Sequence, residues 1–235
     1  MPTLDANTIN GIAANRNTAS MQTSHTVTTS GGNRYLVVAV CYFDGTLTIS
    51  DVLWNGTSMG TALVNTGDPS TEGNIAFYGI ADPDTGTNDV TFTYSGGGTL
   101  DEGAVMVSSW TDVDQTTPVP ETDSDAFDRG TTDTCTVTLG TDAVMIGASY
   151  WYISGGTDLT SFSDTTLDTS NPGVDDESGC HHGYGTDGSQ TWTYDLSSDA
   201  MAVAIELAHD DFVAAGSRIP SIRMVSQAVK RMGNF

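Results

Sequence analysis

Two kinds of β-strand signal alternate along the chain, and they constrain the fold more than any other feature. Continuous apolar runs are typical of strands that are covered on both faces. Segments in which every second residue is apolar are typical of strands with one face in water. The continuous runs are YLVVAVCYF (35–43), IAFYGIA (75–81), AVMVSSW (104–110), AVMIGASYWYI (143–153) and MAVAIELA (201–208), and the alternating segments are DVTFTYS (89–95), CTVTL (135–139) and TWTYDL (191–196).

Turn-forming residues separate these segments. Clusters of Gly, Asn, Asp and Pro, such as WNGT (54–57), DPDTG (82–86) and SGGG (95–98), lie between them. Helical periodicity is nearly absent before residue 212. Short strands at regular spacing, joined by turns, predict an all-β fold: an antiparallel jelly-roll β-sandwich of about eight strands or more.

The predicted sandwich domain covers residues 21–211. Residues 1–20 are polar and rich in Asn and Thr, and they predict a flexible N-terminal arm. Residues 154–190 read as one long loop, of the kind that is often functional or protruding. The sequence offers no recognisable internal repeat and no clean linker, so the prediction is one main domain with a terminal segment on each side.

The charge balance is strongly acidic. The chain has 30 acidic and 7 basic residues and a formal net charge of -23. Such a surface repels nucleic acid and anionic lipid, so we expect neither as a partner. Because molar salt shortens the screening length to about 3 Å, we favour a protein adapted to high salt over an ordinary acidic protein. Neither a signal peptide nor an apolar run of membrane-spanning length is recognisable, which predicts a protein that is made and kept in the cytosol, or that leaves by another route, such as inside a particle.

The segment SGCHHGYGTDG (178–188) concentrates the residue types of metal and catalytic sites. Cys180, His181 and His182 are consecutive, so their side chains should diverge, and no zinc-ligand spacing is present. We therefore predict an exposed glycine-rich loop, with a metal or nucleophilic site as the alternative. The other two cysteines lie in apolar or alternating segments and are predicted core residues.

The turn DPDTGTND (82–89) is the best candidate for a bound cation. Asp82, Asp84 and Asp89 bring hard oxygen ligands together around a glycine, which suits Ca²⁺. The EF-hand spacing is not met, and the same residues make a good turn into the following strand. The preferred prediction is therefore a turn, with Ca²⁺ as the possible cofactor.

No catalytic constellation is recognisable. Glycoside hydrolases need two carboxylates facing each other across the scissile bond, and no pair of Glu residues stands in an aromatic strand. A non-catalytic sugar-binding module is the open alternative, although we favour core positions for the aromatics. The candidate stacking residues are Trp54, Trp110, Trp151, Tyr150 and Tyr152.

The last 24 residues differ from the rest in charge. Residues 1–211 hold three basic residues and all 30 acidic ones, whereas residues 212–235 hold four basic residues and no acidic one. Apolar residues here recur at helical spacing, between a proline and a glycine that suit a helix start and stop. A short basic helix could dock on another subunit or pack on its own body, and both remain open. The predicted partner-binding residues are Arg218, Ile222, Arg223, Val225, Val229, Lys230, Arg231 and Met232.

The order of strand and turn signals resembles a jelly-roll, concanavalin-like sandwich module of tailed-virus structural and surface proteins. The segments that carry the resemblance are NRYLVVAV (33–40), ISDVLWNGTSMGTAL (49–63), IAFYGIADPDTGTNDVTFTYSG (75–96), VMVSSWTDVDQTTPV (105–119) and WTYDLSSDAMAVAIEL (192–207).

This resemblance implies a scaffold without catalytic residues. We therefore predict a non-enzymatic virion protein of a halophile-infecting virus, displayed on the head or tail as a decoration, turret or fibre-base module. It would form a homo-oligomer, contact other virion subunits through its terminal segments, and assemble in the host cytoplasm. The alternative is a β-sandwich module that binds a carbohydrate or receptor on the host surface.

Overall fold

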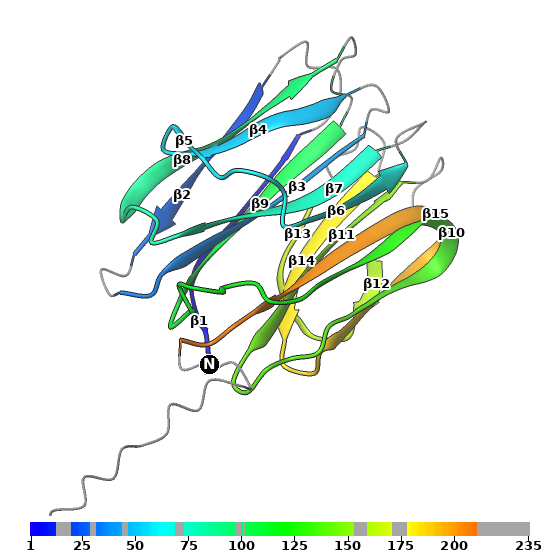
Figure 1. Ribbon diagram of the computed structural model, residues 1–235. Helices are drawn as coiled ribbons and strands as arrows, with labels where there is room; N and C mark the ends of the chain where they lie inside the picture. The colour runs from blue at the N-terminus through cyan, green and yellow to red at the C-terminus, as the bar shows by residue number, and fades with distance from the viewer. Residues whose placement is uncertain are drawn as a thin grey trace, which may run out of the picture.

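The computed structural model describes residues 1–12, 20–28, 32–43, 47–68, 73–96, 100, 102–152, 159–170 and 178–210. These residues form fifteen β-strands and no helix, and every strand pair is antiparallel (Figure 1). The predicted fold class, an all-β antiparallel sandwich, is confirmed. The sandwich has three sheets, one layer more than a simple two-sheet arrangement.

The N-terminal inner sheet has the order β1-β9-β3-β7-β6, and the N-terminal outer sheet has the order β2-β8-β4-β5. The C-terminal sheet has the order β10-β15-β11-β14-β13, and β12 also pairs with β15. The strands of the first two sheets are β1 (Thr3–Ile12), β2 (Ser20–Val27), β3 (Tyr35–Phe43), β4 (Thr48–Trp54), β5 (Thr57–Ser58), β6 (Val64–Asp68), β7 (Gly73–Ala81), β8 (Gly86–Ser95) and β9 (Glu102–Thr111). Those of the third are β10 (Thr122–Thr136), β11 (Val144–Tyr152), β12 (Leu159–Phe162), β13 (Thr165–Ser170), β14 (Ser178–Gly185) and β15 (Ser189–Leu207).

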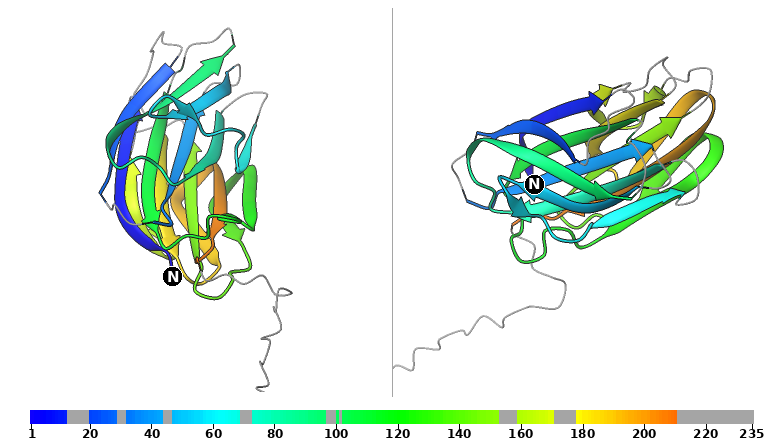
Figure 2. Two further views of the ribbon diagram at one scale, coloured as in Figure 1. Left: turned by 60° about the vertical axis from the view of Figure 1, so that its left-hand side comes forward. Right: turned by 90° about the horizontal axis from the view of Figure 1, so that it is seen from above.

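The N-terminal inner sheet lies in the middle of the molecule (Figures 1 and 2). On β3, Val37 and Ala39 belong to the apolar cluster shared with the C-terminal sheet. The alternate residues Leu36 and Val38 belong to the cluster shared with the outer sheet. Both sets are fully buried. This double coverage explains why the sequence of β3 is a continuous apolar run.

The chain contains two copies of one topology. In chain order, the N-terminal inner sheet is built from β1, β3, β6, β7 and β9, and the C-terminal sheet from β10, β11, β13, β14 and β15. In space, both sheets place these five strands in the order first, fifth, second, fourth, third. This repeat of topology was not detected in the sequence. We call residues 3–111 the N-terminal repeat and residues 122–207 the C-terminal repeat.

The correspondence extends to the smaller layer of each repeat. In the N-terminal repeat, β8 pairs with β2 and β4. In the C-terminal repeat, the first part of β15 pairs in the same way with the second part of β10 and with β12. The long strands β10 and β15 thus each correspond to two separate strands of the N-terminal repeat. The segments VTFTYS (90–95) and QTWTYD (190–195) occupy equivalent places and keep the same alternation.

Each repeat also has its own small core. The N-terminal one lies between the inner and outer sheets. The C-terminal one gathers Met145, Trp151, Trp192, Tyr194 and neighbouring small residues on the second face of the C-terminal sheet. The two repeats then pack against each other through their five-stranded sheets, which contribute equally to the largest apolar cluster. The molecule is a pair of sandwiches joined face to face.

Two sequence predictions of irregular structure were wrong. Within the expected arm 1–20, Thr3–Ile12 forms β1 and pairs along its length with β9. Within the expected loop 154–190, three strands form at the edge of the C-terminal sheet or across it. The polar composition of β12 and β13 is that of strands with an exposed face, which needs no apolar residues, whereas β14 lies between β11 and β13 and is buried. The C-terminal segment 212–235 lies outside the described residues.

The Asn-Gly sequence at 55–56 is confirmed as a tight turn. Asn55 and Gly56 have φ angles of 48° and 76°, and they join β4 to β5. Two successive positive φ angles match the twist of a two-residue hairpin, and Asn-Gly adopts them at little cost.

Candidate functional site

The Cys180-His181-His182 segment is a buried strand, not the exposed loop that its glycines suggested. It belongs to β14, which pairs with β11 on one side and β13 on the other. All three side chains have zero exposed area. The histidine pair therefore lies in the interior, on opposite faces of the C-terminal sheet.

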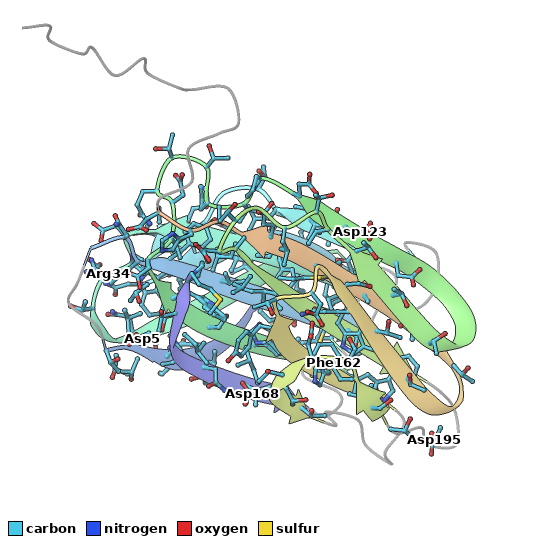
Figure 3. All side chains as sticks on the ribbon, turned by 90° about the horizontal axis from the view of Figure 1, so that it is seen from below. Asp5, Arg34, Asp123, Phe162, Asp168 and Asp195 are labelled. Atoms are coloured by element: carbon cyan, nitrogen blue, oxygen red, sulfur yellow. The ribbon has the colours of Figure 1, made fainter. Side chains whose placement is uncertain are left out.

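His181 is a fully hydrogen-bonded neutral imidazole. Its Nδ1 accepts a hydrogen bond from Trp192 Nε1 at 3.0 Å, so its proton resides on Nε2, which lies 3.1 Å from Thr166 Oγ1. Phe162, which is labelled in Figure 3, packs on the His181 ring with a centroid distance of 4.4 Å. Burial lowers the pKa of His181 to about 4. Both ring nitrogens have hydrogen-bond partners in the core, so His181 is a structural core residue.

His182 faces the other repeat, and neither ring nitrogen has a hydrogen-bond partner. Its ring lies 6.3 Å from that of Phe77, between ring centroids. Burial, and the neighbouring His181, lower the pKa of His182 to about 3. A buried polar group without a hydrogen-bond partner lowers the free energy of unfolding, so His182 destabilises the contact between the repeats.

The acidic turn between β7 and β8 holds its carboxylates apart through separate partners. Asp82 pairs with the Arg34 guanidinium, Asp84 accepts from Asn55 Nδ2 at 3.3 Å, and Asp89 accepts from Ser24 Oγ at 2.7 Å. Hydrogen bonds from Ser24 and Gln22 lower the pKa of Asp89. The predicted turn is confirmed for residues 82–85, whereas Asp89 lies within β8.

The described residues contain no cluster of three or more His, Cys, Asp or Glu side chains placed to hold a metal ion. Ca²⁺ binding by Asp82, Asp84 and Asp89 therefore remains a sequence prediction.

The aromatic residues considered as sugar platforms are mostly in the cores. Trp54, Trp110, Trp151 and Tyr150 are at most 2% exposed. The core interpretation of these four is confirmed, and none offers an open face for stacking. The side chain of Tyr152 lies outside the described part of the chain.

A carboxylate ladder, which the sequence did not reveal, closes one side of the C-terminal repeat. Glu121, Asp123 and Asp125 accept hydrogen bonds from the backbone N–H groups of Thr138, Thr136 and Thr134, at 2.8, 2.7 and 2.7 Å. Asp123 is marked on β10 in Figure 3. The three acids alternate along the chain, as do the three donors, because both segments are extended. The ladder provides hydrogen-bond acceptors for backbone N–H groups that could otherwise pair with a strand of another chain.

The N-terminal repeat closes the same side with a polar network. His25 Nε2 lies 3.1 Å from Ser109 Oγ, and that hydroxyl donates to Asp5 Oδ2 at 3.0 Å. His25 Nδ1 lies 3.0 Å from Thr8 Oγ1. A nucleophilic triad needs the imidazole between the hydroxyl and the acid, whereas here the hydroxyl lies between the two. The network ties β1, β2 and β9 together, and burial lowers the pKa of His25 to about 4.

The predicted partner-binding residues, from Arg218 to Met232, lie outside the described residues. Within the described part, Met1 is the only large hydrophobic side chain that is largely exposed, at 54%. No helix among these residues is long and apolar enough to cross a bilayer. Comparison with protein-family models, curated proteins and solved structures yields no match.

Proposed function

We propose that the protein is a non-enzymatic structural component of a virus particle, in which the double sandwich is a displayed body and the basic C-terminal segment attaches it to its neighbours. The single observation that supports this proposal is the segregation of charge and apolar residues. All 30 acidic residues lie in 1–211, and every charged residue among the last 24 is basic. A segment of opposite charge at the end of a rigid acidic body suits attachment to another subunit.

The apolar residues of this segment favour association with an identical segment. Ile222, Val225, Val229 and Met232 follow spacings of three, four and three, which is the seam of a coiled coil. Ile222 and Val225 place β-branched residues at both seam positions of one heptad, an arrangement that shifts the preference from two strands to three or four. In the described part of the body no large apolar side chain except Met1 is largely exposed, so another copy of the segment is a better apolar partner than the body. We therefore propose a closed homo-oligomer joined by its C-terminal segments.

Serine at Ile222, Val225, Val229 and Met232 is expected to dissociate this oligomer. Sedimentation velocity in 1 M salt should give an oligomer for the parent chain and a 24.6 kDa monomer for the fourfold variant. High salt screens the charges but leaves apolar contacts intact. Replacing the exposed Gln22 by Ser is the matched control and should leave the oligomer unchanged. A monomeric parent chain at all concentrations would refute the attachment role.

The high-salt part of the proposal predicts salt-dependent folding. Because 23 excess negative charges repel one another, the free energy of unfolding should rise as the salt concentration is raised from 0.1 to 2 M. Urea titrations followed by circular dichroism at several salt concentrations measure it. A constant stability across this range would remove the support for a halophilic setting.

The alternative function, carbohydrate or receptor binding, now has less support than the sequence suggested. Four of its five candidate aromatics are in the cores. A glycan-array experiment with the parent chain and the fourfold variant would separate the functions, because sugar binding by the body should survive the loss of the oligomer.

A further inference from the structure

The two repeats meet in the way that identical subunits meet across a twofold axis. The first strand of each repeat lies beside the third strand of the other: β1 beside β13, and β10 beside β6. Asn7 on β1 donates to Asp168 on β13 at 2.7 Å. In a twofold interface, if one strand of the first unit contacts a given strand of the second unit, the equivalent strand of the second unit contacts the equivalent strand of the first. The edges of the two sheets follow this rule.

Equivalent positions also meet at the centre of the interface. Leu36 and Met145 occupy the same place in their sheets, because aligning them matches the members of the shared apolar cluster on β3 with those on β11. The matched pairs are Tyr35 with Val144, Val37 with Ile146, Ala39 with Ala148 and Cys41 with Tyr150. Counting along the ladders from these residues makes Phe77 the equivalent of His182, and their rings lie 6.3 Å apart. Equivalent residues can touch only near a symmetry axis. The axis therefore passes close to this pair.

The apolar surface is shared equally. Each five-stranded sheet contributes nine buried residues to the cluster between the repeats. Trp110, from β9, packs edge-to-face on Tyr184, from β14, at a centroid distance of 5.2 Å. One connector, residues 112–121, carries the chain from one repeat to the other. Neither repeat contributes a strand to the sheets of the other, so the two units can in principle separate without unthreading.

We propose that the inner face of each repeat is a binding surface for a second copy of the same sandwich unit, so that the chain is a fused dimer whose repeats also pair when they belong to different molecules. This inference does not depend on the proposed function. It explains why a face of nine apolar residues exists on each unit: in a single sandwich that face would be exposed to water, and pairing with a second unit buries it. The partner is thus another copy of this unit: the second repeat of the same chain, as in this structure, or the equivalent repeat of another chain that exchanges with it.

The test uses full-length protein that is cut only after folding. A specific protease site replaces Gln115–Thr117 in the connector, in a chain that also carries the serine substitutions of the C-terminal segment, so that this segment cannot join the copies. Equal amounts of cut unlabelled and cut ¹⁵N-labelled protein are mixed, unfolded in urea, refolded and examined by native mass spectrometry. Uncut protein refolded in parallel shows that the conditions permit folding.

We expect two-fragment complexes in which about half are mixed in isotope, the proportion for random pairing. If the uncut chain refolds while the fragments stay separate or precipitate, the proposal is overturned. Placing Trp110→Ala in the labelled population should reduce the share of the labelled N-terminal fragment in complexes at least tenfold. The matched variant Trp54→Ala alters the small core inside the N-terminal repeat. An equal loss for both variants would also overturn the proposal, because it would reflect folding and not recognition.

Discussion

Replacing Trp110 by Ala should lower the free energy of unfolding by about 3–5 kcal/mol. The side chain is 1% exposed, lies in the cluster between the two repeats, and packs on Tyr184. Its Nε1 donates to Ser108 Oγ at 2.9 Å, so the substitution also removes the partner of a buried hydroxyl. Cavity formation and the lost hydrogen bond act in the same direction. Urea unfolding followed by far-UV circular dichroism measures the change.

The control for this substitution is Thr57→Ala, at an exposed position of β5. It should change the free energy of unfolding by no more than about 0.5 kcal/mol. A loss below about 1 kcal/mol for Trp110→Ala would mean that the five-stranded sheets do not pack face to face through this side chain.

Replacing His182 by Phe should stabilise the protein by about 1–3 kcal/mol at neutral pH. The substitution removes two buried ring nitrogens that have no partner. It also gives the position the residue type of its equivalent, Phe77, so that two phenyl rings meet near the axis. Thermal and urea unfolding measure the gain, and a destabilised variant would contradict this account of the site.

The same variant should weaken the pH dependence of stability. In the folded state the pKa values of His181 and His182 are lowered to about 4 and about 3, whereas the unfolded value is about 6.5. Between these limits the unfolded chain binds more protons, so stability falls as the pH drops from about 6.5 towards 3. Burial raises the pKa of Asp164 and Glu206. This effect opposes the loss of stability at low pH, but it is the same in the parent chain and in His182→Phe.

The measurement is a series of urea titrations from pH 7 to pH 4 on the parent chain and on His182→Phe. The two stability curves should diverge as the pH falls, with the parent losing more. Parallel curves would show that His182 is exposed or already hydrogen-bonded.

Much of the fold could be predicted because the strand signals are physical consequences of burial. The continuous apolar run of β3 correctly indicates a strand that is covered on both faces. Val37 and Val38 point to opposite faces of the sheet, and each is buried in a different apolar cluster. The Asn55-Gly56 turn follows from backbone conformation alone. These features depend on neighbouring residues, so a single sequence contains the information needed.

The glycine-rich segment 178–188 was misinterpreted because Gly183 and Gly185 serve packing, and only Gly188, with a φ of 70°, lies in a turn. A Cβ atom on Gly183 would collide with the ring of Phe162, and one on Gly185 with the carboxylate of Asp164. Glycine in a strand can mark such a close approach, but the approaching groups come from another part of the chain. Sequence spacing alone cannot indicate them.

The duplication was missed because the repeats share burial pattern and not residue identity. Phe77 corresponds to His182, and the separate strands of one repeat are fused into the long strands β10 and β15 in the other. The alternation in VTFTYS (90–95) and QTWTYD (190–195), one hundred residues apart, was the signal that could have revealed it. The carboxylate ladder was hidden for a related reason, since its acids look like ordinary surface residues until their backbone partners are known.

The central claim is that two copies of one sandwich unit pack face to face about an axis near Phe77 and His182. Nuclear Overhauser spectroscopy on the full-length chain, with selectively labelled Phe and His rings, tests it most directly. The account predicts cross-peaks between the ring protons of Phe77 and His182, whose centroids are 6.3 Å apart, and between those of Trp110 and Tyr184, at 5.2 Å. Absence of both sets of cross-peaks in the folded protein would contradict it.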